Sequence, residues 1–244
     1  MRVYEGRRTR EEYLQSQIQR SSPKFRFCKV SAHDVRKYRH VIVRHAGERG
    51  VRQALLGPML CLGTRNGREI DLFRTEFFGS RARRFAVRWA ETLGPFAFQS
   101  RLPWLESRGR SSLARLTPES VWGVELNPMG ARQDVWTGSF DELPAEWAGK
   151  FGIVYSNSFD HSEDPERTIR EWKHMVRPGG YLILCYVRKQ QVSHSDPVGE
   201  LTAEDVLGLL REELVYFQDG GSCNNYSEAI ICLPRTPKGA VNGS

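Results

Sequence analysis

The fold is decided between Met59 and Gly67, where the chain reads M-L-C-L-G-T-R-N-G and continues directly as R-E-I-D-L-F. Four uncharged residues lead into a glycine turn, and a helical pattern begins where the turn ends. This predicts a buried parallel strand followed by a crossover helix over residues 69–78. Such a turn presents backbone N–H groups at a helix N-terminus and can hold a nucleotide-like ligand. Because Arg65 stands where a G-x-G-x-G loop has its middle glycine, the stretch alone is equally typical of an ordinary strand-to-helix turn.

The length and composition allow one large α/β domain or two small ones. The chain has 244 residues, of which 39% are hydrophobic, and this is enough to bury a substantial core. The longest apolar runs, such as Tyr181 to Val187, are far too short to cross a bilayer, and the arginine-dotted N-terminus has no apolar signal segment. We therefore expect a cytoplasmic protein that makes no use of a membrane.

The cysteines predict buried free thiols. Their number is odd, none are spaced as C-x-x-C, and most lie in apolar stretches. This pattern favours neither a zinc site nor a disulfide framework, and we expect no metal. The cysteines are Cys28, Cys61, Cys185, Cys223 and Cys232.

Charge is unevenly distributed along the chain. Residues 1–64 carry 14 Lys and Arg against 5 Asp and Glu, residues 65–115 carry 11 against 5, and residues 116–244 carry 11 against 19. A basic front half and an acidic rear half could steer an anionic partner toward the protein. The alternative is genomic, because 29 of the 36 basic residues are arginine, which a GC-rich genome favours by itself.

Residues 1–54 are predicted to form an N-terminal helical extension. A charged helix is expected around residues 11–19, and no chemistry is visible in it. Ser31 and Asp34 form a capping box for a second helix that runs toward His45. This second helix either covers the mouth of a ligand crevice or packs on the sheet.

An insertion separates the first crossover helix from the second strand. Glu125, at the tip of the strand predicted over residues 121–125, lies 62 positions beyond Gly63, whereas a strand–helix–strand unit needs about 30 residues. The excess, residues 79–118, interleaves arginines with aromatic residues. It forms either a surface that stacks on rings and neutralises phosphate or carboxylate, or a helical hairpin with packed aromatics and solvated arginines. These residues are Arg81, Arg83, Arg84, Arg88, Arg101, Arg108 and Arg110 with Phe85, Trp89, Phe96, Phe98 and Trp104.

The remaining segments continue the alternation of strands and helices. Asp164 is an N-cap with proline at the next position, so a helix is expected to run to about Val176, where residues 177–180 end it. The two closing strands are joined by a short loop without a helix and should be antiparallel neighbours. Further strands are expected over residues 134–136, 151–156, 181–186, 214–218 and 228–233, a further helix over 202–213, and a loose tail over 234–244.

Glu125 is the candidate ligand for a ribose. A carboxylate at the C-terminal tip of the strand that follows a glycine turn is placed to accept two hydrogen bonds from a 2′,3′-diol. The alternative is a solvated carboxylate at a strand end.

Four motifs follow one another between residues 59 and 186, on either side of the insertion. They read L-C-L-G-T-R-N-G, V-W-G-V-E-L-N-P, G-S-F-D-E-L-P and F-G-I-V-Y-S-N-S-F-D-H-S-E-D-P-E-R-T-I-R-E-W-K-H-M-V-R-P-G-G-Y-L-I-L. In this order the motifs resemble those of class I S-adenosylmethionine-dependent methyltransferases, particularly the type 11 group. The resemblance implies a three-layer, doubly wound α/β fold over residues 55–244. Its seven-stranded sheet would be mostly parallel with an antiparallel last strand, and its cofactor would be S-adenosyl-L-methionine.

The resemblance also assigns roles around that cofactor. Gly63 and Gly67 would line its methionine and ribose end, Glu125 would bind the ribose diol, and Asn157 would face the sulfonium. The loop over residues 139–141 would lie against the adenine. The implied cofactor-binding residues are Gly63, Thr64, Arg65, Gly67, Glu125, Leu126, Ser139, Phe140, Asp141 and Asn157.

Two residues depart from the family pattern. Arg65 replaces a glycine, so its side chain must point away from the cofactor or clamp the cofactor's carboxylate. Ser139 stands where an acidic residue often reads the adenine amino group, which would leave that contact to Asp141 or to the backbone. If both departures weaken binding, the protein could retain the fold and lose the cofactor.

Methyl transfer requires an aligned nucleophile and, for a hydroxyl acceptor, removal of a proton. His161 follows the fourth strand of the predicted sheet, near the expected methyl side, and is the candidate base because an unperturbed imidazole titrates near pH ~6.5. Asp160 and His194 are further candidates. The alternative is a structural histidine that ties the loop to the next helix.

Three classes of function follow from these features. The first is methylation of a small polar acceptor, such as a sugar or natural-product hydroxyl, because the N/D-P-P-Y signatures of base amino methylation are absent. The second is methylation of RNA or another nucleic acid through the basic front half and the insertion. The third is a binding protein that retains the fold without catalysis. The acceptor and the oligomeric state are not predicted.

Overall fold

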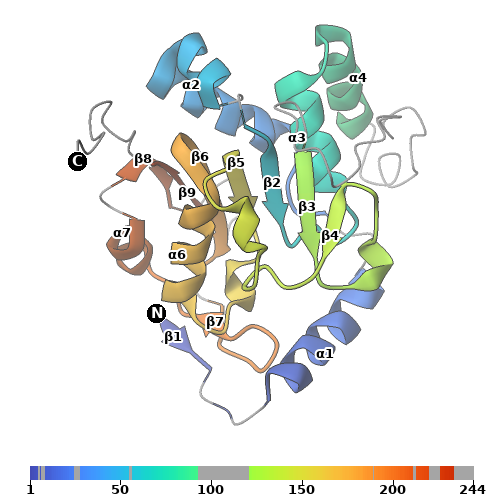
Figure 1. Ribbon diagram of the computed structural model, residues 1–244, viewed down its shortest axis with the longest axis vertical. Coiled ribbons are helices and arrows are strands. Elements are labelled where there is room, and N and C mark those ends of the chain that lie inside the picture. Colours follow the sequence, from blue (N-terminus) through green and yellow to red (C-terminus); the bar gives the residue numbers. More distant parts are fainter. Residues whose placement is uncertain are drawn as a thin grey trace, which may run out of the picture.

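The computed structural model describes residues 1–4, 6, 9–24, 28–54, 57–92, 121–188, 190–210, 213–219 and 226–233. Its centre is a seven-stranded sheet in the order β4-β3-β2-β5-β6-β9-β8 (Figure 1). All neighbouring pairs from β4 to β6 are parallel, whereas β9 is antiparallel to both of its neighbours. The strands are β2 (Met59–Leu62), β3 (Val121–Glu125), β4 (Val135–Thr137), β5 (Phe151–Ser156), β6 (Val176–Val187), β8 (Leu214–Gln218) and β9 (Tyr226–Cys232).

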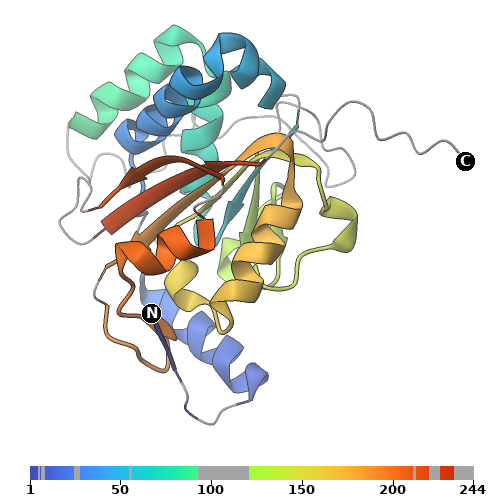
Figure 2. The ribbon, with the colours of Figure 1, turned by 90° about the vertical axis from the view of Figure 1, so that its left-hand side faces the viewer.

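Helices cover both faces of this sheet, which makes the three layers of a doubly wound fold. Helices α2, α3 and α4 lie on one face, and α6 and α7 lie on the other (Figure 2). The predicted fold class is therefore confirmed, including the antiparallel last strand. The helices are α1 (Arg10–Ser21), α2 (Ala32–Ala54), α3 (Arg68–Phe78), α4 (Arg81–Thr92), α6 (Pro165–Met175) and α7 (Ala203–Leu210).

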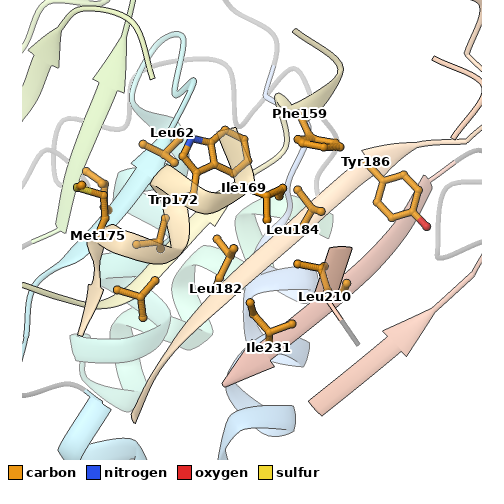
Figure 3. Packing of buried hydrophobic residues seen from close by; sticks show 14 of the residues in the cluster. Leu62, Phe159, Ile169, Trp172, Met175, Leu182, Leu184, Tyr186, Leu210 and Ile231 are labelled. Atoms are coloured by element: carbon orange, nitrogen blue, oxygen red, sulfur yellow. The ribbon is translucent and has the colours of Figure 1, made fainter. Parts of the chain in front are cut away.

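The strands alternate their side chains between the two faces, as the pleat requires. In β2, Met59 and Cys61 pack with α2 and α3, while Leu60 and Leu62 pack with the cluster on the other side. Figure 3 shows that second cluster, where Ile169 and Trp172 of α6 lie over β6 and β2. Because both faces are apolar, the sheet is fixed in position and its strand ends form a rigid edge.

The sequence left open whether the second helix covers the mouth of a ligand crevice or packs on the sheet, and the structure shows the second arrangement. Helix α2 packs on the sheet, with Val35, Tyr38 and Ile42 buried in the same cluster as Met59. Its predicted capping box is present, because the Asp34 N–H donates to Ser31 Oγ and the Ser31 N–H donates to the Asp34 carboxylate. The division into an extension of residues 1–54 and a domain of residues 55–244 stays a prediction.

The helix end predicted near Val176 is confirmed, but the strand predicted to begin at Tyr181 already begins at Val176. Helix α6 ends at Met175, and Val176 already begins β6, because Pro178 has no N–H for a helix whereas an extended chain accepts it. Residues 177–180 therefore belong to the strand, where the Gly179 N–H donates to the Leu233 carbonyl. Helix α2 continues past His45 to Ala54 across a kink at Gly47, whose φ is 68°.

Several further elements complete the description. A short strand, β1 (Arg2–Val3), pairs antiparallel with β7 (Val198–Gly199) and was not predicted. The insertion begins with α4, while its residues 93–118, the Gly220-Gly221 turn and the tail over 234–244 lie outside the described residues. The 3-10 turns are η1 (Ser22–Lys24), η2 (Pro128–Gly130), η3 (Ala145–Trp147) and η4 (Phe159–His161).

Buried free thiols were predicted: Cys61 and Cys185 are buried, whereas Cys28 and Cys232 are half-buried, and Cys223 lies outside the described part of the chain. Each helix in that part is too short or too polar to cross a bilayer.

Candidate functional site

A pocket opens at the C-terminal ends of β2 and β3. Parallel strands that end beside a helix N-terminus form the crevice in which doubly wound proteins bind ligands. Helix α1 lies across this end of the sheet (Figure 1). The lining residues are Tyr13, Leu14, Gln17, Ser21, Gly63, Arg65, Val124, Glu125, Leu126, Gly138, Ser139, Phe140, Asp141, Ser158 and His161.

The glycine turn after β2 fits against its neighbours only without a side chain. Gly63 has φ 74°, and a Cβ there would lie 2.3 Å from Ser158 Oγ and 2.8 Å from Ser158 Cβ. The Gly63 and Thr64 N–H groups both donate to the Val124 carbonyl, at 2.9 and 3.1 Å. Gly67, also at φ 74°, is the N-cap of α3. At Gly63 the backbone itself therefore forms part of the pocket wall, because a side chain there would occupy the space in front of Ser158.

Arg65 stands where the family resembled in sequence has a glycine, and it takes up the left-handed backbone that favours glycine. Its φ is 49°, and its N–H donates to Glu125 Oε2 at 2.6 Å. The guanidinium reaches the Lys24 carbonyl oxygen in η1 at 3.4 Å. The side chain is therefore drawn toward the segment that follows α1.

Glu125 is a buried acceptor at the centre of the lining. It is 7% exposed, and its Oε1 and Oε2 each accept one backbone N–H, from Asn127 at 2.8 Å and from Arg65 at 2.6 Å. Burial raises the pKa of the carboxyl, while the two N–H donors oppose that rise. Since an ionised carboxylate offers about four lone-pair positions, two remain for a ligand's hydroxyls.

The loop after β4 lines the opposite side of the pocket. Trp172 Nε1 donates to the Phe140 carbonyl at 3.1 Å, and the two rings meet edge to face with centroids 5.5 Å apart. Asp141 accepts from Thr168 Oγ1 at 2.6 Å. Burial raises the pKa of Asp141 to about 6. Its N–H donates to Ser139 Oγ at 3.2 Å, so the loop is held by α6 and by its own turn.

His161 ends η4 and lies on the pocket wall. Its Nδ1 is 3.1 Å from the Ser195 carbonyl oxygen and 3.3 Å from Asp196 Oδ1. Because a carbonyl oxygen can only accept, Nδ1 carries the proton. Nε2 has no hydrogen-bond partner among the described residues, and it remains an acceptor.

Not every predicted residue lines the pocket. Thr64 is buried, with its hydroxyl unpaired among the described residues. Asn157 lies beside the pocket and accepts from Ser158 Oγ at 3.2 Å, so Ser158 lines the wall instead. Asp160 is 8% exposed and outside the lining. His194 packs edge-on against the Tyr4 ring, with centroids 5.8 Å apart. Gly67 caps α3 outside the lining.

The first helix, in whose sequence no chemistry is visible, lines the pocket. Helix α1 contributes Tyr13, Leu14, Gln17 and Ser21 to the pocket. The Asn127 amide, two residues beyond Glu125, donates to Ser21 Oγ at 2.9 Å. Spacings of three and four residues place these side chains on one helix face, and this spacing is the signal that could have found them.

Asp160, His161 and Asp196 form the one group among the described residues whose donor atoms lie close enough for a metal ion, within 4.8 Å of one another. Arg20 already forms an ion pair with Asp196. A guanidinium at that carboxylate disfavours a second cation there.

Comparison with known proteins agrees with this geometry. The family described as "Methyltransferase domain" matches residues 107–184. No curated protein matches the chain. A 1,6-didemethyltoxoflavin-N1-methyltransferase from Burkholderia thailandensis, solved with S-adenosylhomocysteine, is 15% identical and has a TM-score of 0.52, with 96% of this chain and 94% of that chain covered. The N-methyltransferase NodS from Bradyrhizobium japonicum is 13% identical with a TM-score of 0.42, covering 77% and 96%.

The sheet order is that of the Rossmann-like fold, which the chain shares with the Burkholderia thailandensis methyltransferase. About a third of the chain, residues 107–184, matches the methyltransferase family model. That neighbour holds S-adenosylhomocysteine, the demethylated form of the S-adenosyl-L-methionine that the sequence resemblance implies as cofactor. The residues present fit that molecule. Glu125 is a buried carboxylate acceptor in the lining, and at Gly63 the close-packed backbone leaves no space for a Cβ.

Proposed function

We propose that this enzyme methylates a hydroxyl group of a small polar acceptor, with His161 as the general base. The observation that carries the proposal is His161, whose Nδ1 is fixed by Ser195 and Asp196 while its ring lies on the pocket wall. The roof formed by α1 also favours a small acceptor over a polymer, because four α1 residues line the pocket. A methyltransferase of similar fold acts on 1,6-didemethyltoxoflavin, itself a small molecule.

We place the cofactor in this pocket in the orientation that the sequence resemblance implies, and the lining supports it. Glu125 accepts the ribose hydroxyls, the loop over residues 139–141 lies against the adenine, and Gly63 with Arg65 borders the methionine end. Leu126 contributes apolar contact, whereas Thr64, Gly67 and Asn157 support the wall from behind. Bound S-adenosylmethionine supplies an electrophilic methyl group on a sulfonium.

His161 acts on the acceptor. Nε2 accepts the hydroxyl proton as the oxygen attacks, while Ser195 and Asp196 hold the ring through Nδ1. A positioned base of this kind contributes about 10²- to 10⁴-fold to the rate. Asp160 is buried outside the lining, so we assign it no part in the reaction.

A labelled-methyl assay tests the proposal. The protein is incubated with methyl-labelled S-adenosylmethionine and a panel of monosaccharides and phenols, and His161→Ala is compared with His174→Ala, which changes a histidine in the last turn of α6. We expect transfer to a hydroxyl compound and at least a hundredfold loss in His161→Ala, with unchanged S-adenosylhomocysteine binding by calorimetry. Undiminished turnover in His161→Ala would remove the base assignment.

A nucleic-acid substrate is the second candidate. Helix α4 exposes Phe85 (69%) and Trp89 (60%) beside Arg81, Arg83 and Arg84, a combination that suits stacking and phosphate contacts. It lies at the opposite end of the molecule from α1 in both views (Figures 1 and 2). The labelled-methyl assay with RNA added distinguishes the two candidates. This candidate is favoured if label enters RNA but none of the small hydroxyl compounds, and if the transfer weakens steeply as salt rises.

A further inference from the structure

Asp196 is a buried carboxylate in the segment between β6 and β7, held in a turn of its own. It is 7% exposed. Its N–H donates to Ser193 Oγ at 3.0 Å, and the Ser193 N–H donates to the Asp196 carbonyl at 3.0 Å. Ser193 Oγ also donates to Oδ2 at 3.3 Å. These bonds leave Oδ1 directed at other partners in a fixed orientation.

One of those partners is the candidate base. Asp196 Oδ1 lies 3.3 Å from His161 Nδ1, next to the Ser195 carbonyl oxygen at 3.1 Å. Two oxygens at one ring nitrogen keep the proton on Nδ1, and this leaves Nε2 as the nitrogen that can accept a proton from a ligand.

The other partner comes from α1. Arg20 Nη1 donates to Asp196 Oδ1 and, at 3.2 Å, to the Ser195 carbonyl. Gln17 Nε2 donates to the same carbonyl at 2.6 Å. Tyr13 OH donates to the carbonyl of His161 itself.

These three α1 residues are spaced 13, 17 and 20, and therefore lie on one helix face. That face contacts His161 or one of its two Nδ1 partners at every position. The same helix also supplies Tyr13, Leu14, Gln17 and Ser21 to the pocket lining. Seating of α1 and orientation of the imidazole are thus parts of one hydrogen-bonded arrangement.

We infer that Asp196, held by Arg20, is a positioning residue that keeps His161 as the Nδ1–H tautomer with Nε2 toward the acceptor, and that this arrangement forms only when α1 is seated. The inference rests on the proposed function for its effect on turnover. The tautomer itself does not depend on the identity of the acceptor.

The first test is spectroscopic and uses the full chain with S-adenosylhomocysteine. Long-range ¹H–¹⁵N spectra report which ring nitrogen of His161 carries the proton. We expect the Nδ1–H form in the native protein and a measurable Nε2–H population in Asp196→Asn, because the Asn amide can donate to Nδ1 when Arg20 holds its oxygen. An unchanged tautomer in the variant overturns the inference, whatever substrate is found.

The second test is kinetic. With a hydroxyl acceptor from the panel above, Asp196→Asn and Arg20→Ala should lower kcat about 10- to 100-fold, while KM for S-adenosylmethionine changes less than threefold. Arg10→Ala is the matched control, because Arg10 ties α1 to Glu163 at 3.3 Å and to Glu142 at 3.0 Å without contacting His161 or its partners. If kcat falls equally in Arg10→Ala and Arg20→Ala, Arg20 acts only by holding α1 in place, and its positioning role is overturned.

A third test asks whether the group formed by Asp160, His161 and Asp196 holds a metal ion. If EDTA abolishes turnover and a divalent cation restores it, Asp196 and His161 are bridged by a metal, and the positioning role is overturned. We expect EDTA to leave turnover unchanged, because Arg20 already neutralises Asp196.

Discussion

Glu125 shows how a single buried carboxylate can be prepared for a ligand. Two backbone N–H groups fix its oxygens before any hydroxyl approaches. An acceptor that is already oriented costs less entropy on binding than one that must be ordered. The sequence left open a solvated carboxylate at this strand tip, and that alternative is wrong because Glu125 is buried. Its role toward a ribose stays a prediction.

Glu125→Gln should therefore weaken binding of S-adenosylhomocysteine about 10- to 100-fold. The amide replaces a charged acceptor, and hydrogen bonds to charged groups contribute about 1.5–3 kcal/mol. Calorimetry measures the affinity, and Glu146→Gln, an exposed change in η3, is the control. An affinity within twofold of the native value, in a variant with a native melting temperature, would contradict the assignment to ribose.

Other site residues were less predictable at this scale. Asn157 and Ser158 are neighbours in sequence, and the pattern could not tell which of the two would face the pocket, because the chain leaves β5 in an irregular turn. Asp196 lies in a segment without a recognisable motif. Its importance follows only from its contacts with His161 and Arg20.

The elements around the pocket differ in how visible they are in the sequence. The glycine turn and the strands carry strong local patterns, and they were predicted to within a few residues. Helix α1 was predicted as a helix, yet its place over the strand ends depends on distant contacts such as Gln17 with Ser195. Such contacts leave no periodic signal. The same holds for the pairing of β1 with β7.

The turn between β2 and α3 provides the sharpest test of an element. Gly63→Ala adds a Cβ that meets Ser158 at 2.3 Å, in a left-handed backbone that costs about 1–2 kcal/mol for a residue with a Cβ. We expect at least tenfold weaker binding of S-adenosylhomocysteine and a lower melting temperature.

The chain offers a matched control for that experiment. Gly149 has φ 64° with nothing within 4 Å of its Cβ position, so Gly149→Ala carries the backbone cost without the clash. Adding Ser158→Gly to Gly63→Ala should recover part of the binding. Equal binding in Gly63→Ala and Gly149→Ala would show that the turn does not need the close approach.

At the scale of the whole molecule, stability should depend on pH through a buried acid in α3. Glu69 is 3% exposed, and its Oε2 has no hydrogen-bond partner among the described residues. Burial raises its pKa from 4.5 to about 7. The folded state then binds a proton that the unfolded state has released, so the free energy of unfolding falls as pH rises from about 4.5 to about 7.

Glu69→Gln removes this titration. Relative to the native protein, the variant should gain stability between pH 5 and pH 8 by an amount on the order of 2–3 kcal/mol, a rise of several degrees in relative melting temperature. Thermal unfolding at both pH values measures it. The exposed change Glu146→Gln should show no such pH-dependent gain. A constant difference between native and Glu69→Gln proteins across this range would contradict the raised pKa.

The overall architecture was the most predictable level. The alternation of strands and helices and the short closing loop indicated an α/β fold with an antiparallel end, and the family resemblance implied the seven-stranded sheet. The start of β6 was predicted five residues too late, because proline and two glycines end a helix but also fit an extended chain. Residues 93–118 carry no period that decides between the two predicted arrangements.

The position of β9 has a consequence for biosynthesis. Strand β8 joins the sheet only through β9, which comes later in the chain and pairs with β6 on its other side. While the nascent polypeptide emerges from the ribosome, the β6 edge stays open until residues 226–232 have been translated. Until then that edge is a template for pairing with another chain, and chaperone occupancy during translation should be greatest in this interval.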